Sequence, residues 1–392
     1  MTTTLPHFEP FSPDAVAHPG GALAEGALAL GSDGYTVLSY ELATAVLRDG
    51  RFKNAALTLM EEFGITDGPV HEFRANSMLR AEGPRHLKLR MPLARFMGPA
   101  TVENIRGVLR EIIQDLAADL DPSAPVDFHG AVDQRLPARV YCHLAGAPAE
   151  DAPKVASLSE RTLSLLNRDP SQTPTIISAY AELFAYLKAL VASKRAQGLG
   201  EDMLSFLIGQ HDAGKLTEDE LFNEAAAMLE ASSVNTTHQT GLVVWTLLSD
   251  REIWQRLVKD PSLIPDAVVE VLRLYPRPGI VSKIAGEDIE LNGTVVPAGS
   301  DVHVAVWSAN RDPARFENPS EFVLGRERNQ PLTFSTGSHN CLGQGLARVE
   351  MEEVVAYLVK RFPNAVVHED DTEIGQLGGR WLVQSLAVDL RP

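Results

Sequence analysis

Apolar and polar positions along this chain follow mainly a helical period. Apolar residues recur at helical spacing over residues 40–47, 101–120, 136–144 and 261–275. Alanine-rich segments with the same period fill much of the region from about 150 to 215. The pattern therefore predicts a protein built largely from helices.

A further stretch, Thr217 to Asp250, is apolar over most of its helical circumference. Thr217 is followed three positions later by Glu220, which is the spacing of a capping box at the start of a helix. We expect one unusually long helix over the whole stretch.

Strand composition is confined to short runs at 34–39, 281–285, 289–296 and 370–390. Glycines and a proline interrupt residues 57–79, which are expected to be irregular. The chain has no internal repeat, linker or low-complexity tract. We therefore expect a single domain, residues 1–392, that is mainly α with small β-sheets.

The composition is that of a soluble globular protein, with 44% apolar and 22% charged residues. A formal charge of -17 disfavours nucleic acid and acidic membranes as partners. The N-terminal residues lack a basic start followed by an apolar run, so neither a signal peptide nor a membrane anchor is predicted. We expect a cytoplasmic protein.

The candidate chemistry centres on one of the two cysteines. Cys341 stands between Gly337 and Gly343 at the mouth of a predicted helix, where the helix N-terminus favours a thiolate. Such a residue can be a nucleophile, a zinc ligand, a haem ligand or simply a buried thiol. A nucleophile elbow needs glycine at position 339, and a structural zinc site needs about four ligands. Position 339 is a histidine, so the elbow pattern is not met. Cys142 is remote in the sequence and is assigned to the core, so the zinc-site pattern is not met either.

The run from Phe334 to Gly343, Phe-x-x-Gly-x-His-x-Cys-x-Gly, resembles the haem-binding loop of the cytochrome P450 superfamily. The resemblance implies the cytochrome P450 fold, with haem b (iron protoporphyrin IX) between a long central helix and the helix after the cysteine. It also implies that Cys341 is the iron ligand and that Phe334 and Gly343 contact the cofactor. Ser335 departs from the family, which usually has glycine there.

Further cofactor contacts follow from the same resemblance. His86 and Arg90 are four residues apart in a basic segment, as in the His-x-x-x-Arg pair that holds haem propionates in the family. Lys283 stands where the family commonly has a propionate-binding arginine, and His339 is expected to contribute as well. Pro92 should kink or end the basic helix.

Residues 231–237 resemble the oxygen-activating segment of the family. Thr236 is retained, whereas Asn235 replaces the usual acid and two serines replace the usual small residue and glycine. The resemblance implies that Thr236 and Asn235 are the catalytic residues that handle oxygen and protons. It also implies a structural role for Glu270, Arg273 and Arg326, which in the family form a buried ion-pair network.

Together these features predict a haem-thiolate monooxygenase that inserts one oxygen atom from O2 into a largely hydrophobic small molecule. Electrons from NAD(P)H would arrive through a separate ferredoxin docking near Arg80–Arg95, and we expect a monomer. A peroxide-using peroxygenase and a non-catalytic haem sensor remain alternatives. The expected pocket residues, mostly apolar, are Met228, Ala231, Ser232, Ile280, Val281, Trp381 and Leu382.

Overall fold

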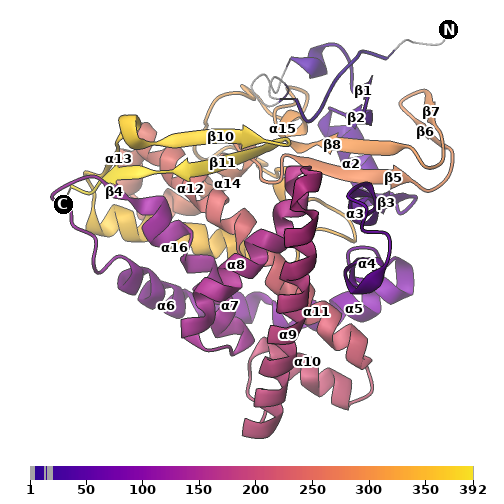
Figure 1. Ribbon diagram of the computed structural model, residues 1–392. Helices are drawn as coiled ribbons and strands as arrows, with labels where there is room; N and C mark the ends of the chain where they lie inside the picture. The colour runs from indigo at the N-terminus through magenta and orange to yellow at the C-terminus, as the bar shows by residue number, and fades with distance from the viewer. Residues whose placement is uncertain (1–4, 13–14, 16–20, 392) are drawn as a thin grey trace.

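Helices make up most of the chain in the computed structural model, which describes residues 5–12, 15 and 21–391. Figure 1 shows the helices filling one side of the molecule and a small sheet at the other. The helices are α2 Tyr40–Arg48, α3 Ala56–Glu62, α4 Gly68–Asn76, α5 Gly83–Phe96, α6 Pro99–Leu116, α7 Leu136–Ala145, α8 Ala152–Leu163, α9 Thr173–Gln197, α10 Met203–Asp212, α11 Glu218–Ala231, α12 Val234–Ser249, α13 Arg251–Lys259, α14 Ile264–Leu274, α15 Val306–Ala309 and α16 Gln344–Arg361.

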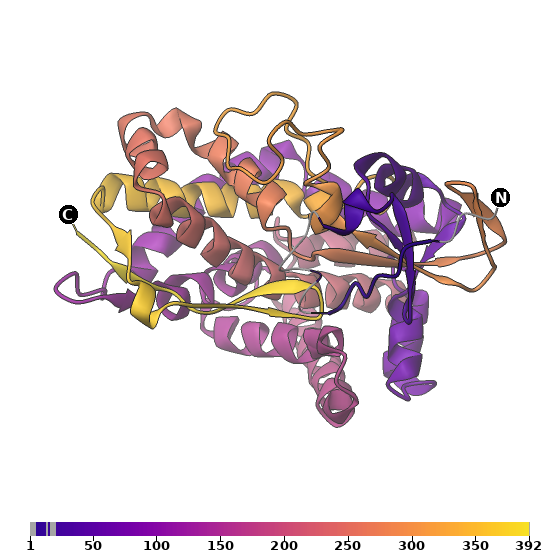
Figure 2. The same cartoon turned by 90° about the horizontal axis from the view of Figure 1, so that it is seen from above.

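The main sheet has five strands in the order β1-β2-β8-β5-β3. These strands are β1 Leu28–Gly31, β2 Gly34–Val37, β3 Phe52–Asn54, β5 Ile280–Ala285 and β8 Asp301–Ala305. Among the ladders between these five strands, only the β2–β8 pairing is parallel, and it joins the N-terminal segment to the sequence after α14. Seen from above, the sheet lies beside the helices rather than between two layers of them (Figure 2).

The remaining strands form small antiparallel ladders. They are the hairpin β6 Ile289–Leu291 with β7 Thr294–Val296, the hairpin β10 Glu373–Leu377 with β11 Arg380–Ser385, and the three-stranded sheet of β4 Val126–Asp127, β12 Ala387–Asp389 and β9 Val366–Val367. The predicted class, mainly α with small sheets, is confirmed. Strand β11 packs against α12, which brings the C-terminal hairpin beside the central helices.

The largest apolar clusters hold together the helices next to the loop that carries Cys341. One cluster joins α6, α12, α14 and α16 through Leu109, Leu247, Val271 and Val354, all essentially inaccessible to solvent. Burial of such side chains contributes roughly 1.5–3 kcal/mol each. The loop before α16, which carries Cys341, is therefore anchored to the most strongly packed helices.

The long central helix is interrupted, so the prediction of one continuous helix from Thr217 to Asp250 is wrong. The capping box at Thr217 and Glu220 is present, but α11 ends at Ala231 and α12 starts at Val234. The Ser232 hydroxyl donates to the carbonyl of Leu229 at 2.7 Å. Serine side chains compete with the backbone ladder in this way, and apolar periodicity does not register it.

Two other local expectations need correction. Residues 57–79 are not irregular, because they hold most of α3 and all of α4. Gly68 and Pro69 open α4 rather than break it, as proline fits the first turn of a helix. Helix α5 does not end at Pro92 but continues to Phe96.

Helix α9 is the one element of the described chain that is long and apolar enough to cross a membrane by length and composition. In the fold it packs against α8 and α11. Its side chains Ile176, Tyr180, Leu183 and Leu187 are buried in the protein core. Its apolar character is therefore explained by packing.

Candidate active site

A cavity of about 750 Å³ lies between α12 and the loop that carries Cys341. It brings together residues that are far apart in the sequence. Of the predicted site residues, those that line it are Met228, Ala231, Ser232, Asn235, Thr236, Ile280, Val281, His86, Arg90, Phe334, His339, Cys341 and Gly343. Of the residues predicted to contact cofactor or substrate, three do not line it, namely Lys283, Trp381 and Leu382.

The cysteine loop folds back on itself just before α16. The Cys341 amide donates to the carbonyl of Phe334 at 2.8 Å, which closes the loop. Gly337 has φ of 80°, and a Cβ there would lie 2.8 Å from the carbonyl oxygen of Leu47 in α2. The glycine is therefore required by packing against α2 as well as by its positive φ.

The electrostatics of Cys341 differ from the sequence expectation. Burial raises the pKa of the Cys341 thiol above its usual range, although the Gly343 amide and the Arg90 charge both oppose this. The local effect of the helix N-terminus has the expected direction, because the Gly343 amide lowers the pKa of the thiol, but burial acts against it. Cys341 precedes the N-cap Gly343 by two residues, and the desolvation effect outweighs the nearby positive groups.

Two imidazoles and one guanidinium gather beside this loop. The rings of His86 and His339 lie 4.3 Å apart between centroids, and Arg90 donates to the Asn340 carbonyl at 2.6 Å. Burial lowers the pKa of His86 to about 4, and it also lowers that of His339. Both side chains are therefore held as neutral imidazoles near pH 7.

Lys283 and Glu82 stand behind the imidazoles. Lys283 is buried on β5, where burial lowers its pKa, and its charge lowers the pKa of His339. A Glu82 carboxylate oxygen lies 3.4 Å from Nε2 of His339. Lys283 therefore lies close to His339, but it is not exposed to the cavity.

This set of residues fits the cofactor that the sequence resemblance implies. Nε2 of His86 is buried without a hydrogen-bond partner, and Nε2 of His339 has the 3.4 Å ion-pair contact with Glu82 but no hydrogen bond of normal geometry. Both nitrogens, with Arg90, belong to residues of the same cavity wall as Cys341. A metal-centred group that bears carboxylates would supply a partner for the thiol and acceptors for these nitrogens.

Opposite this cluster, the start of α12 carries Asn235 and Thr236 into the cavity wall. The Asn235 Oδ1 is buried and has no protein partner. The hydroxyl groups of Ser232 and Ser233 lie 3.2 Å apart at the interruption of the helix. The Asn235 amide oxygen is thus available at the cavity, whereas the Ser232 hydroxyl bonds to the helix carbonyl of Leu229.

The C-terminal hairpin reaches the cavity through other residues than predicted. Trp381 packs edge-on against Tyr275 at 5.3 Å between centroids, and Gly378 and Arg380 line the cavity instead. Successive side chains on a strand point to opposite faces, which places Trp381 on the face opposite to Arg380. The sequence contained no signal that set this register.

Three buried arginines of the cavity wall were missed by the sequence analysis. Arg74 of α4 pairs with Glu230 of α11 and donates to the Tyr180 hydroxyl. Arg277 follows α14, and Arg380 begins β11. Arginine is common on protein surfaces, and only the fold shows that these three are buried.

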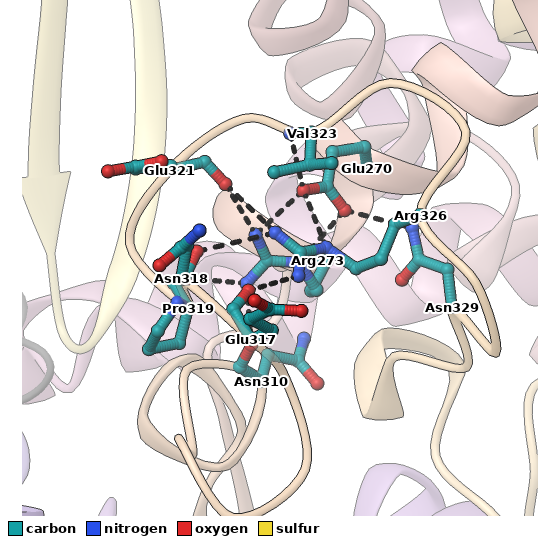
Figure 3. A network of polar contacts seen from close by, with 10 residues as sticks. All are labelled: Glu270, Arg273, Asn310, Glu317, Asn318, Pro319, Glu321, Val323, Arg326 and Asn329. Atoms are coloured by element: carbon teal, nitrogen blue, oxygen red, sulfur yellow. Dashed lines mark hydrogen bonds and ion pairs between the residues drawn. The ribbon is translucent and has the colours of Figure 1, made fainter.

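A separate network below the site involves Glu270 (Figure 3). Its carboxylate accepts hydrogen bonds from Arg273 at 2.8 and 2.9 Å and from Arg326 at 3.0 Å. It also accepts from the Val323 amide and the Asn329 side chain. Glu270 and Arg273 are completely buried. The predicted contact between Arg326 and this pair is present, as an ion pair with Glu270.

Comparison with known proteins agrees with these observations. A family model for cytochrome P450 matches residues 164–384. Nocardicin C N-oxygenase of Nocardia uniformis subsp. tsuyamanensis is 35% identical over 377 residues, which cover 93% of this chain and 93% of that protein. Luteothin monooxygenase of Streptomyces thioluteus is 31% identical over 380 residues, covering 96% and 92%.

Solved structures show the same fold. The crystal structure of CalO2 has a TM-score of 0.91 with 24% identity over 100% of both chains. The tirandamycin C-bound P450 monooxygenase TamI has a TM-score of 0.82 with 27% identity, covering 98% of this chain and 100% of the other. The chain therefore belongs to the cytochrome P450 family and is an oxidoreductase of that family.

Proposed function

We propose that this protein is a haem-thiolate monooxygenase that oxidises a largely hydrophobic small organic substrate. The observation that carries the proposal is the single cavity that Cys341, the His86–His339 cluster and Thr236 all line. Members of the family use haem iron, which supplies the oxygen chemistry. We assign haem b to this site, with Cys341 as the iron ligand.

The residues beside the cysteine loop would hold the cofactor. Arg90, His86 and His339 offer a guanidinium and two buried ring nitrogens for propionate groups. Lys283 is assigned a supporting role, because it lies near His339 without lining the cavity. Phe334 and Gly343 line the same wall and would contact the ring.

Thr236 and Asn235 would act on the opposite side. The Thr236 hydroxyl can donate and accept a hydrogen bond, and the Asn235 amide can orient a water molecule but cannot titrate. Met228, Ala231, Ser232, Ile280 and Val281 would surround the substrate.

Electrons would come from NAD(P)H through a separate ferredoxin. The outer face of α5 carries a stripe of Leu87, Met91 and Arg95 at a spacing of four residues. Leu87 is 56% exposed and Met91 44%, and Arg95 is exposed beside them. An apolar centre with a basic rim is suited to an acidic partner, and Arg90 links this helix to the cysteine loop. We further propose a cytoplasmic monomer that works as one domain.

The decisive experiment is the substitution Cys341→Ser. The variant should lose the thiolate-type absorption spectrum of the ferrous carbon monoxide complex, because serine cannot supply the sulfur ligand. Cys142→Ala is the matched control and should retain the spectrum, since Cys142 is a core residue of α7. A thiolate-type spectrum in the Cys341→Ser variant would refute the proposal.

A further inference from the structure

Two arginines of the cavity wall are buried without a negative partner. Arg277 and Arg380 both line the cavity and are 4% and 6% exposed. Arg277 lies in the segment between α14 and β5, and Arg380 is the first residue of β11. Two separate elements of the fold thus bring positive charge to one region of the wall.

The protein groups that these arginines contact are neutral. Arg277 donates to the carbonyl of Trp381, and its Nε is buried without a partner. Arg380 donates to the Leu166 carbonyl and, at 3.1 Å, to the Asn167 side chain. Among residues 5–12, 15 and 21–391, neither arginine forms an ion pair with a carboxylate.

Other charged groups of the cavity show the contrast. Arg74 is equally buried, but it pairs with Glu230, and this carboxylate raises the pKa of Arg74. Arg168 lies 3.6 Å from Glu62. Glu230 and Glu62 of the cavity wall thus pair with Arg74 and Arg168 rather than with Arg277 or Arg380.

Electrostatics in the protein alone are unfavourable at the Arg277–Arg380 pair. Burial and the neighbouring charge of Arg380 lower the pKa of Arg277 to about 9, and burial lowers that of Arg380 to about 10. His238 does not add to this positive charge, since burial and the Arg277 charge lower its pKa to about 3 and keep it neutral. A buried cation is costly unless an anion or several hydrogen bonds compensate it.

We propose that Arg277 and Arg380 form a carboxylate-binding subsite and that the substrate is an amphipathic carboxylic acid. This assignment rests on the monooxygenase function proposed above and names its substrate class. A carboxylate can accept from two guanidinium groups at once, and such charge-assisted bonds are the strong ones. Pro278, Ile280 and Leu165 line the same cavity and would contact an apolar body.

The test compares acids with their uncharged analogues. Isothermal titration of the ferric, haem-loaded protein would use a library of aryl and alkyl carboxylic acids, each with its primary amide and its alkyl phosphate counterpart. At least one acid should bind about tenfold more tightly than its amide, since one charged hydrogen-bonding pair provides a factor of that order. The phosphates should bind less tightly than the acids.

Variants locate the preference. Arg277→Gln and Arg380→Gln should each reduce acid affinity about tenfold while amide affinity changes by less than about twofold. Arg277→Lys should keep part of the preference, because it keeps the charge but not the planar fork. Arg168→Gln is the matched control, a cavity arginine already near Glu62, and should leave the acid-to-amide ratio unchanged.

Four results would overturn the assignment. They are an acid library with no member preferred over its amide, an acid preference that survives both glutamine variants, an equal loss of acid and amide affinity, and tighter binding of the phosphates. The carbon monoxide spectrum and substrate-dependent NAD(P)H consumption are recorded separately on the wild type. If the wild type shows neither of them, the monooxygenase proposal is refuted. If both are present but no acid binds more tightly than its amide, only the subsite is refuted.

Discussion

At the scale of single residues, Asn235 and Ser335 are two of the departures from the family pattern. Asn235 presents an amide to the cavity with its Oδ1 unpaired. Ser335 has φ of 59° and ψ of -172°, a region that is essentially reserved for glycine. One departure thus affects chemistry and the other affects backbone strain.

For proton handling, we predict that turnover is sensitive to Thr236 and tolerant of an acid at position 235. Thr236→Ala should divert NAD(P)H electrons to hydrogen peroxide, because the cavity loses its hydroxyl donor. Asn235→Asp should keep or raise the product formed per NAD(P)H, since a carboxylate can also transfer protons. Product and peroxide yields measure both effects.

Thr246→Ala provides the control, because this threonine lies on α12 but does not line the cavity. Its yields should match the wild type. If Asn235→Asp abolishes product while haem and substrate still bind, Asn235 has a specific contact with substrate rather than a place in the proton path.

Ser335→Gly should stabilise the protein. The strained conformation costs about 1–3 kcal/mol, and the added chain entropy of glycine offsets about 0.5–1 kcal/mol of the relief. We expect a net gain of about 1 kcal/mol, seen as a higher unfolding temperature. Ser335→Ala keeps the Cβ and should show no such gain. A lower unfolding temperature for Ser335→Gly would contradict the strain argument.

At the scale of elements, helix α5 has one face toward the cysteine loop and another that is exposed. His86 and Arg90 point to the cysteine loop, whereas the Leu87–Met91–Arg95 stripe is exposed. Lys88 is not free for a partner, since it forms an ion pair of 2.6 Å with Glu220 at the start of α11. The basic segment seen in the sequence is therefore only partly available for docking.

Charge reversal of Arg95 tests the docking face. Arg95→Glu should weaken the apparent ferredoxin affinity roughly three- to tenfold at low salt, and less at high salt, because rim charges act mainly on association. Substrate affinity should not change. The measurement is the rate of haem reduction against ferredoxin concentration.

Arg256→Glu is the matched control, an exposed residue of α13, which lies far from α5 in Figure 1. Equal reduction kinetics for Arg95→Glu and the wild type would place the docking face elsewhere. Lys88→Glu is a poorer test, because it would put a negative charge against Glu220 and disturb α11.

At the scale of the whole molecule, the Glu270 network ties helix α14 to the extended segment before the cysteine loop. Glu270 and Arg273 belong to α14, whereas Val323, Arg326 and Asn329 belong to that segment (Figure 3). Both residues of the α14 pair are fully buried. A segment with little secondary structure of its own is thus fixed by one satisfied carboxylate.

Glu270→Ala should destabilise the entire fold by about 3–5 kcal/mol, because it leaves Arg273 as an uncompensated buried charge. The apparent unfolding temperature and the fraction of protein that retains haem measure the effect. Glu182→Ala, which breaks a largely exposed pair with Arg161, should cost less than about 1 kcal/mol. Equal effects of the two substitutions would contradict the assigned importance of the network.

Local sequence patterns determined several helices, one helix cap and the family of this protein. Hydrophobic periodicity predicted α2, α6, α7 and α14, and the ten-position pattern around Cys341 predicted the family. Spacing also predicted the capping box of α11, and the family resemblance predicted the Glu270–Arg273 pair. These features depend on residues close together in the chain, where side-chain identity and spacing fix the geometry.

Only the tertiary structure decided the interruption between α11 and α12, the raised pKa of Cys341 and the cavity position of Arg380 in place of Trp381. Each depends on burial or strand register, which arise from contacts between distant segments. The same holds for the burial of Arg277 and Arg380, because only the fold removes these two arginines from water without a carboxylate partner in the described part of the chain. Sequence spacing contains no measure of that desolvation.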